Sequence, residues 1–119
     1  MNKPLALIIE DDPQLGMIFS LTLQKEFETE IITNGQAAID RLAEIMPVLV
    51  VLDANLPQVG GIGVLKHIRS DPRLVNTKVI IATADSNQYA ILAEGADIAI
   101  LKPVSPIQLR EFATRLRNA

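Results

Sequence analysis

Five short apolar runs recur along the chain, at residues 5–9, 30–33, 48–52, 78–82 and 97–101. All but the second are almost continuous Val, Ile, Leu and Ala, which is typical of parallel strands covered on both faces. The second run contains Glu30 and Thr33, which favours a place at the edge of a sheet. The pattern therefore predicts five strands, four of them deeply buried or nearly so.

Helix start signals follow several of these runs. Asp12-Pro13 and Ser105-Pro106 each place a capping side chain directly before a proline, a common helix start. Asn34-Gly35 marks the turn into the second helix. The apolar face of the first helix is expected to contain Leu15, Ile18, Phe19 and Leu23.

Two further helices are expected between the later strands. The third covers about residues 62–69 and stops before Asp71-Pro72, because a residue preceding proline disfavours helical geometry. The fourth covers about residues 87–94 and has Gly95 as its expected C-terminal cap.

Alternating strands and helices with short connections predict an α/β fold with right-handed crossovers. For five strands we expect a doubly wound parallel sheet of order 2-1-3-4-5 in a flavodoxin-like three-layer sandwich. The 119 residues suffice for one domain, covering residues 1–119. Ligands of such sheets bind beyond the carboxyl ends of the strands where the winding reverses, here between the first and third strands.

Polar residues follow four of the predicted strands at that edge of the sheet. Glu10 and Asp11 follow the first strand, Asp53 the third, Thr83 the fourth and Lys102 the fifth. Because the strands are parallel, these side chains are expected to meet in one pocket. Clustered carboxylates repel one another and need a cation, and a set of oxygen ligands suits Mg²⁺.

The same residues suggest a chemistry for the pocket. A cation, the ammonium of Lys102 and the hydroxyl of Thr83 around one carboxylate would stabilise a transferring phosphoryl group. Asp53 can then act as the nucleophile and form an acyl phosphate.

Composition and net charge argue against several other classes of function. The chain has no cysteine, which excludes disulfides and thiolate metal sites and fits a cytoplasmic protein. A net charge of −3 without a basic stripe argues against direct nucleic-acid binding. No apolar stretch is long enough to cross a membrane.

Short motifs at the strand ends resemble those of the receiver domain of two-component response regulators, the CheY-like family. They occupy residues 9–12, 52–57, 61, 82–84, 95–97 and 101–103. The resemblance implies that Asp53 takes a phosphoryl group from phospho-histidine on a sensor histidine kinase or a histidine phosphotransfer protein. It also implies that Thr83 and Lys102 bind the phosphoryl oxygens and that the Lys102-Pro103 peptide bond is cis.

The resemblance further assigns the metal ligands. Asp11 and Asp53 would bind Mg²⁺ directly, Glu10 through water, and Asn55 through its backbone carbonyl. Asn55 and Asp85 also match two variable positions that tune hydrolysis of the acyl phosphate, which implies a short-lived phosphorylated state.

The family's switch is expected to move the face formed by the fourth helix, the fifth strand and the last helix. That face, including Gln88, Tyr89 and Leu92, would contact a downstream partner, a tethered output domain or a second copy of the chain. Two positions depart from the family pattern. Ala99 replaces the usual aromatic residue of the switch, and Gly60 replaces an Asp often found before Gly61.

Three alternatives compete with a phosphoacceptor domain. Such a domain is not expected to be an enzyme in the ordinary sense, but to have self-phosphorylation and autodephosphorylation chemistry. A haloacid-dehalogenase-type phosphatase would need a second Asp where Asn55 stands. In a flavodoxin-like cofactor site, the phosphate of the cofactor would be repelled by Glu10, Asp11 and Asp12. A receiver-like interaction module that does not depend on phosphorylation stays open because of Ala99.

Overall fold

The computed structural model describes residues 3–119 as five strands and their covering helices. The strands are β1 (Leu5–Ile9), β2 (Glu28–Ile32), β3 (Leu49–Asp53), β4 (Lys78–Thr83) and β5 (Ile98–Leu101). All are parallel and form one sheet in the order β2-β1-β3-β4-β5. The predicted α/β topology and the edge position of β2 are confirmed.

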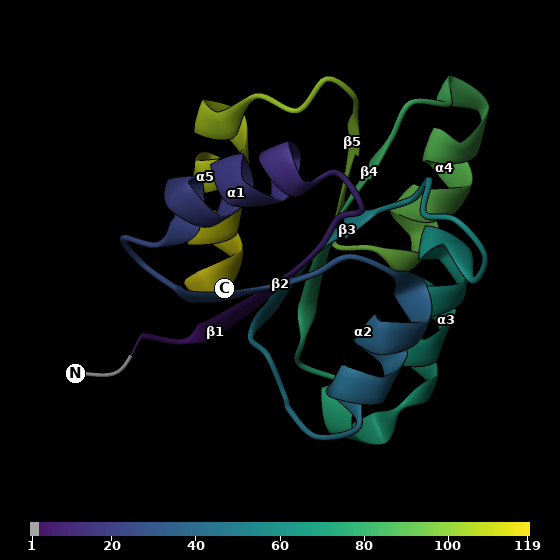
Figure 1. Ribbon diagram of the computed structural model, residues 1–119, viewed down its shortest axis with the longest axis horizontal. Coiled ribbons are helices and arrows are strands. Elements are labelled where there is room, and N and C mark those ends of the chain that lie inside the picture. The colour runs from purple at the N-terminus through teal and green to yellow at the C-terminus, as the bar shows by residue number, and fades with distance from the viewer. Residues whose placement is uncertain (1–2) are drawn as a thin grey trace.

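Five helices cover the two faces of this sheet. They are α1 (Pro13–Leu23), α2 (Gly35–Leu42), α3 (Gly60–Ser70), α4 (Ser86–Gly95) and α5 (Pro106–Arg117), with a single 3₁₀ turn, η1, at Pro72–Leu74. Helices α1 and α5 lie on one face, and α2, α3 and α4 lie on the other (Figure 1). Within residues 3–119, none of the helices has the length and apolar character needed to cross a membrane.

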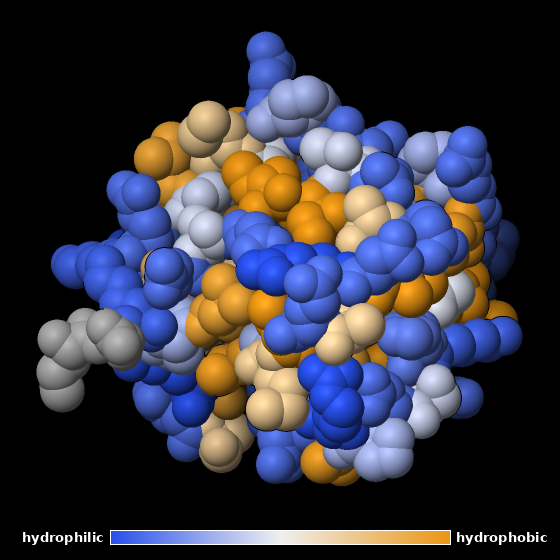
Figure 2. Space-filling model, turned by 60° about the horizontal axis from the view of Figure 1, so that its bottom comes forward, coloured by the Kyte–Doolittle hydropathy of each residue, from blue (hydrophilic) through white to orange (hydrophobic). Residues whose placement is uncertain are grey.

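Each face of the sheet has its own apolar core. Side chains of alternate strand residues point to opposite faces. Ile8 and Ile80 therefore pack with α1 and α5, whereas Ile9 and Ile81 pack with α2, α3 and α4. On the outer surface shown in Figure 2, apolar patches are interrupted by hydrophilic side chains.

The three helix starts that were predicted from capping residues are found where expected. The Asp12 carboxylate accepts a hydrogen bond from the Gln14 N–H (2.9 Å), and Ser105 Oγ accepts one from the Gln108 N–H (3.3 Å). Asn34 caps α2 in the same way. These caps fix where the chain leaves the strand ends and turns back along the sheet.

Several predicted boundaries were wrong by one or two residues. Strand β2 begins at Glu28 rather than residue 30, and α3 begins at Gly60 rather than residue 62. Strand β3 ends at Asp53, so this residue belongs to the strand and its Cα pairs with that of Ala82.

Two predictions about single residues were also wrong. Gly95 is the last residue of α4 and not a left-handed cap; a Cβ there would lie 3.1 Å from Leu65 Cδ2, so close packing of α4 against α3 explains the glycine. Ile18 is exposed, since Gly16, Phe19 and Leu23 form the buried side of α1.

Candidate functional site

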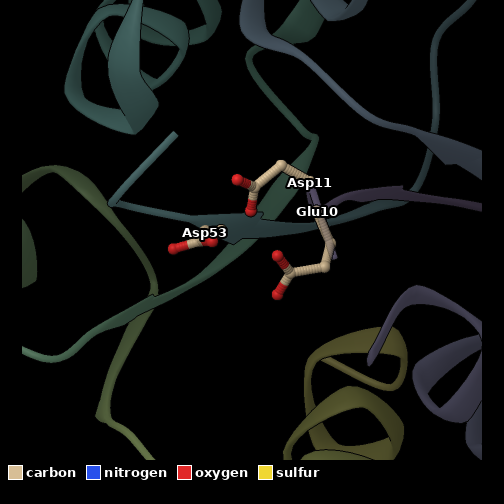
Figure 3. Close-up of side chains that lie close together, drawn as sticks. All are labelled: Glu10, Asp11 and Asp53. Carbon is tan, nitrogen blue, oxygen red and sulfur yellow. The ribbon is translucent and has the colours of Figure 1, made fainter. Parts of the chain in front are cut away.

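Three carboxylates meet at the carboxyl ends of β1 and β3. One oxygen each from Glu10, Asp11 and Asp53 can be chosen so that all lie within 4.8 Å of one another. The two strands are neighbours in the sheet, and Figure 3 shows the three side chains extending from their ends around a common space. The structure thus brings these predicted residues together.

Burial sets the electrostatics of Glu10. Its side chain is nearly enclosed, with 3% of the residue exposed. The pKa of the Glu10 carboxyl is raised to about 7, mainly by burial. Hydrogen bonding with Asp53 and Asp11 and the charge of Asp53 add to this, against the lowering effect of the Asp12 N–H. Without a cation, the pocket therefore disfavours a third negative charge.

Asp53 lies in the same buried pocket but has partners that favour its charge. Lys102 Nζ is 2.8 Å from Asp53 Oδ1, which also accepts a hydrogen bond of 2.9 Å from the Asn55 N–H. Burial alone raises the pKa of Asp53, but these hydrogen bonds outweigh it and hold the pKa below its ordinary value. The carboxylate is ionised and oriented, as a nucleophile requires.

Thr83 ends β4 and is fully buried. It follows Ala82, whose Cα pairs with that of Asp53, so the backbone places Thr83 beside the carboxylate cluster. Its hydroxyl accepts a hydrogen bond from the Asp85 N–H (3.0 Å) and donates one to Gln88 Oε1 (3.3 Å). In this structure the hydroxyl is therefore engaged with the first turn of α4.

Asn55 links the loop after β3 to the loop after β4 at the edge of the pocket. Its side-chain Oδ1 accepts a hydrogen bond of 3.3 Å from the Ala84 N–H, while its own N–H is bonded to Asp53. Residue periodicity cannot reveal a contact between two loops, so sequence reasoning missed this bridge. The Lys102-Pro103 peptide bond is cis, as the resemblance implied.

The pocket continues into an apolar cavity that the sequence did not predict. The cavity has a volume of about 400 Å³ and lies between the sheet and helices α1 and α5. Phe19 and Leu109 belong to its apolar wall, while Glu10, Asp53 and Lys102 contribute its charged groups. Its walls come from four strands, two helices and the segment after β5, so no local motif could indicate it.

The residues present fit a hard divalent cation. All three converging side chains are carboxylates, and oxygen ligands of this kind suit Mg²⁺. The ammonium of Lys102 lies on Asp53, so a cation and an ammonium would flank the same carboxylate. Such an arrangement can stabilise negative charge that develops on a phosphoryl group.

Comparison with known proteins identifies relatives of the chain. The family model described as the response regulator receiver domain matches residues 6–114. The DNA-binding response regulator MtrA of Mycolicibacterium smegmatis is 32% identical, over 93% of this chain and 48% of that protein. The phosphate regulon transcriptional regulatory protein PhoB of Rhizobium meliloti is 34% identical, over 98% of this chain and 53% of that protein.

Solved structures agree with this result. The signal receiver domain of a signal transduction histidine kinase from Syntrophus aciditrophicus superimposes with a TM-score of 0.88 at 28% identity, covering 97% of this chain and 90% of that one. The chain spans about half the length of the two curated relatives above. By the family match over residues 6–114, the chain belongs to the response regulator receiver domain family.

Proposed function

We propose that this receiver domain is a phosphoacceptor, in which Asp53 takes a phosphoryl group from a phospho-histidine donor. The observation that carries the proposal is the buried, ionised Asp53 carboxylate, held by Lys102 at 2.8 Å and flanked by Glu10 and Asp11. The donor would be a sensor histidine kinase or a histidine phosphotransfer protein.

In the proposed step, a carboxylate oxygen of Asp53 forms a bond to phosphorus while the bond between phosphorus and the donor imidazole nitrogen breaks. Lys102 loses part of its contact with the carboxylate and pairs with a phosphoryl oxygen. The hydroxyl of Thr83 donates a hydrogen bond to a second phosphoryl oxygen. Asp53 thus needs no proton removed before it attacks, because its pKa already lies below the ordinary value.

Mg²⁺ would be held by Glu10, Asp11 and Asp53, with the backbone carbonyl of Asn55 as a further proposed ligand. When bound, the ion supplies positive charge that offsets the carboxylates and the incoming phosphoryl oxygens. The raised pKa of Glu10 supports this assignment, since it marks a carboxylate whose charge lacks compensation.

The proposed output is a change on the face formed by α4, β5 and α5. Tyr89, Ile91 and Leu101 are exposed large apolar residues on α4 and at the end of β5. Leu92 was predicted on this surface, but it is buried in the core and cannot contact a partner directly. MtrA is named as DNA-binding and PhoB as a transcriptional regulatory protein. By analogy, we propose that the face controls a downstream protein or a tethered output domain in the cytoplasm, or pairs with a second copy.

The proposal is tested by labelling the purified chain with a small phosphodonor such as radioactive acetyl phosphate. We expect labelling that requires Mg²⁺, disappears in Asp53→Asn and persists in Asp40→Asn. Asp40 is an exposed carboxylate on α2 and provides a matched control. Labelling that survives Asp53→Asn would contradict the proposal, and no labelling at all would favour an interaction module independent of phosphorylation.

A further inference from the structure

The hydroxyl of Thr83, the last residue of β4, is hydrogen-bonded to the first turn of α4. Asp85 is the N-cap of α4, and its own N–H donates to Thr83 Oγ1 at 3.0 Å. The same hydroxyl donates to Oε1 of Gln88 at 3.3 Å, and Gln88 comes three residues after Asp85. Thr83 therefore links the N-cap residue and the third helical residue of α4.

This chain of hydrogen bonds resembles a capping box with one group inserted. In a capping box, the side chain of a Glu or Gln at the third helical position accepts a hydrogen bond directly from the N-cap N–H. Asp85 and Gln88 occupy those two positions. Here the Thr83 hydroxyl stands between them, so the conformation of the first turn depends on where that hydroxyl points.

A threonine hydroxyl has one proton to donate. It cannot donate that proton to Gln88 and to a phosphoryl oxygen at the same time. We propose that Gln88 is a positioning residue that competes with the phosphoryl group for the Thr83 hydroxyl, so that phosphorylation releases Gln88 and rearranges the first turn of α4. This inference rests on the proposed function and names its regulatory link.

Because the phosphoryl group and Gln88 compete for one hydroxyl, each must weaken the other's contact with it. If binding of a phosphoryl group breaks the contact between Thr83 and Gln88, then removing the contact must favour binding of the phosphoryl group by the same factor. Release of Gln88 from the Thr83 hydroxyl also affects a part of α4 that reaches the surface, since Tyr89 follows Gln88 and is 39% exposed. The hydroxyl thus connects the buried pocket with an accessible helix face.

The test uses Mg²⁺ and beryllofluoride, which mimics the phosphoryl group on an aspartate. Gln88→Leu removes the acceptor but keeps a residue of high helix propensity. We expect it to bind beryllofluoride about 2- to 10-fold more tightly than wild type, the range of one net hydrogen bond. Asn87→Leu is the matched control, because Asn87 is an exposed neighbour on the same turn, and it should stay within about twofold.

A double-mutant cycle assigns the effect to the contact itself. In a Thr83→Ala background, Gln88→Leu should bring no further gain in affinity, because the competing hydroxyl is gone. Amide hydrogen exchange gives a second measurement. Beryllofluoride should change exchange at residues 85–88 in wild type and in Asn87→Leu, and should change it less in Gln88→Leu, where the contact between Thr83 and residue 88 is already absent.

The outcomes separate the two proposals. A wild-type chain that does not bind beryllofluoride in the presence of Mg²⁺ would overturn both the phosphoacceptor function and this inference. Normal binding, but with equal affinity in wild type and Gln88→Leu or an equal exchange response in both, would overturn only the role of Gln88.

Discussion

Glu10 and Asp53 show how two carboxylates in one pocket acquire opposite properties. Both are almost fully buried, but only Asp53 has a cationic partner, Lys102. The pKa of Glu10 is consequently raised to about 7, and that of Asp53 is lowered. One carboxylate is therefore suited to nucleophilic attack, and we expect the charge of the other to depend on a bound cation.

This difference predicts how stability depends on pH. A carboxyl whose pKa rises on folding binds more protons in the folded state, so it makes stability fall as pH increases. For Glu10 this fall should occur between about pH 4.5 and 7 and amount to about 1–3 kcal/mol in the free energy of unfolding. The lowered pKa of Asp53 acts only at more acidic pH, where the stability contributed by its ionised form is lost as the pH falls.

Urea unfolding at a series of pH values without divalent ions checks this prediction. We expect Glu10→Gln to flatten the profile between pH 4.5 and 7, and saturating Mg²⁺ to flatten that of wild type. Glu44→Gln, a change of an exposed carboxylate after α2, should leave the slope intact. A wild-type profile that rises across this range would contradict the assigned pKa of Glu10.

At the scale of elements, the loop from β3 to α3 depends on close backbone packing. A Cβ on Gly61 would overlap the backbone oxygen of Asp53 and the Cα of Ala54, so only glycine fits. Gly60 has a φ of 74°, in the left-handed region, but has open space around it. The two glycines therefore serve different purposes: Gly61 permits contact and Gly60 permits the turn.

Replacing these glycines should have graded effects. Gly61→Ala must displace the backbone that carries Asp53, and we expect a loss of more than about 2 kcal/mol in unfolding free energy, together with at least tenfold slower labelling. Gly60→Ala should cost about 1–2 kcal/mol through its backbone conformation alone. Gly63→Ala, inside α3 with only a flexible Val59 methyl nearby, is the control and should be close to neutral.

Thermal and urea unfolding, combined with acetyl phosphate labelling, measure these changes. If Gly61→Ala folds and is labelled like wild type, the β3–α3 loop does not position Asp53 in the way described above.

The success of sequence reasoning also varied between elements. Short apolar runs, four of them almost continuous, identified all five strands, and the pairs Asp12-Pro13 and Ser105-Pro106 marked two helix starts, because both signals are local. Gly95 was misread because a glycine at a helix end can serve either a turn or close packing. Only the neighbouring Leu65, distant in sequence, decides between the two.

At the scale of the whole molecule, topology explains why the pocket could be predicted. Strand order 2-1-3-4-5 brings the carboxyl ends of β1, β3, β4 and β5 to one edge, and the polar residues after each apolar run are visible in the sequence. The contacts made by those residues were not visible. The bond from Thr83 to Gln88 and the bond from Ala84 to Asn55 depend on how loops fold over the pocket.

The central claim is that this edge of the sheet forms one phosphoacceptor site centred on Asp53. The most direct measurement is to treat the chain with acetyl phosphate and Mg²⁺, reduce the acyl phosphate with borohydride, and locate the product by tandem mass spectrometry. We predict conversion of Asp53 alone to homoserine, dependent on Mg²⁺. Conversion at another carboxylate, or none at Asp53 while the chain remains folded, would contradict the account.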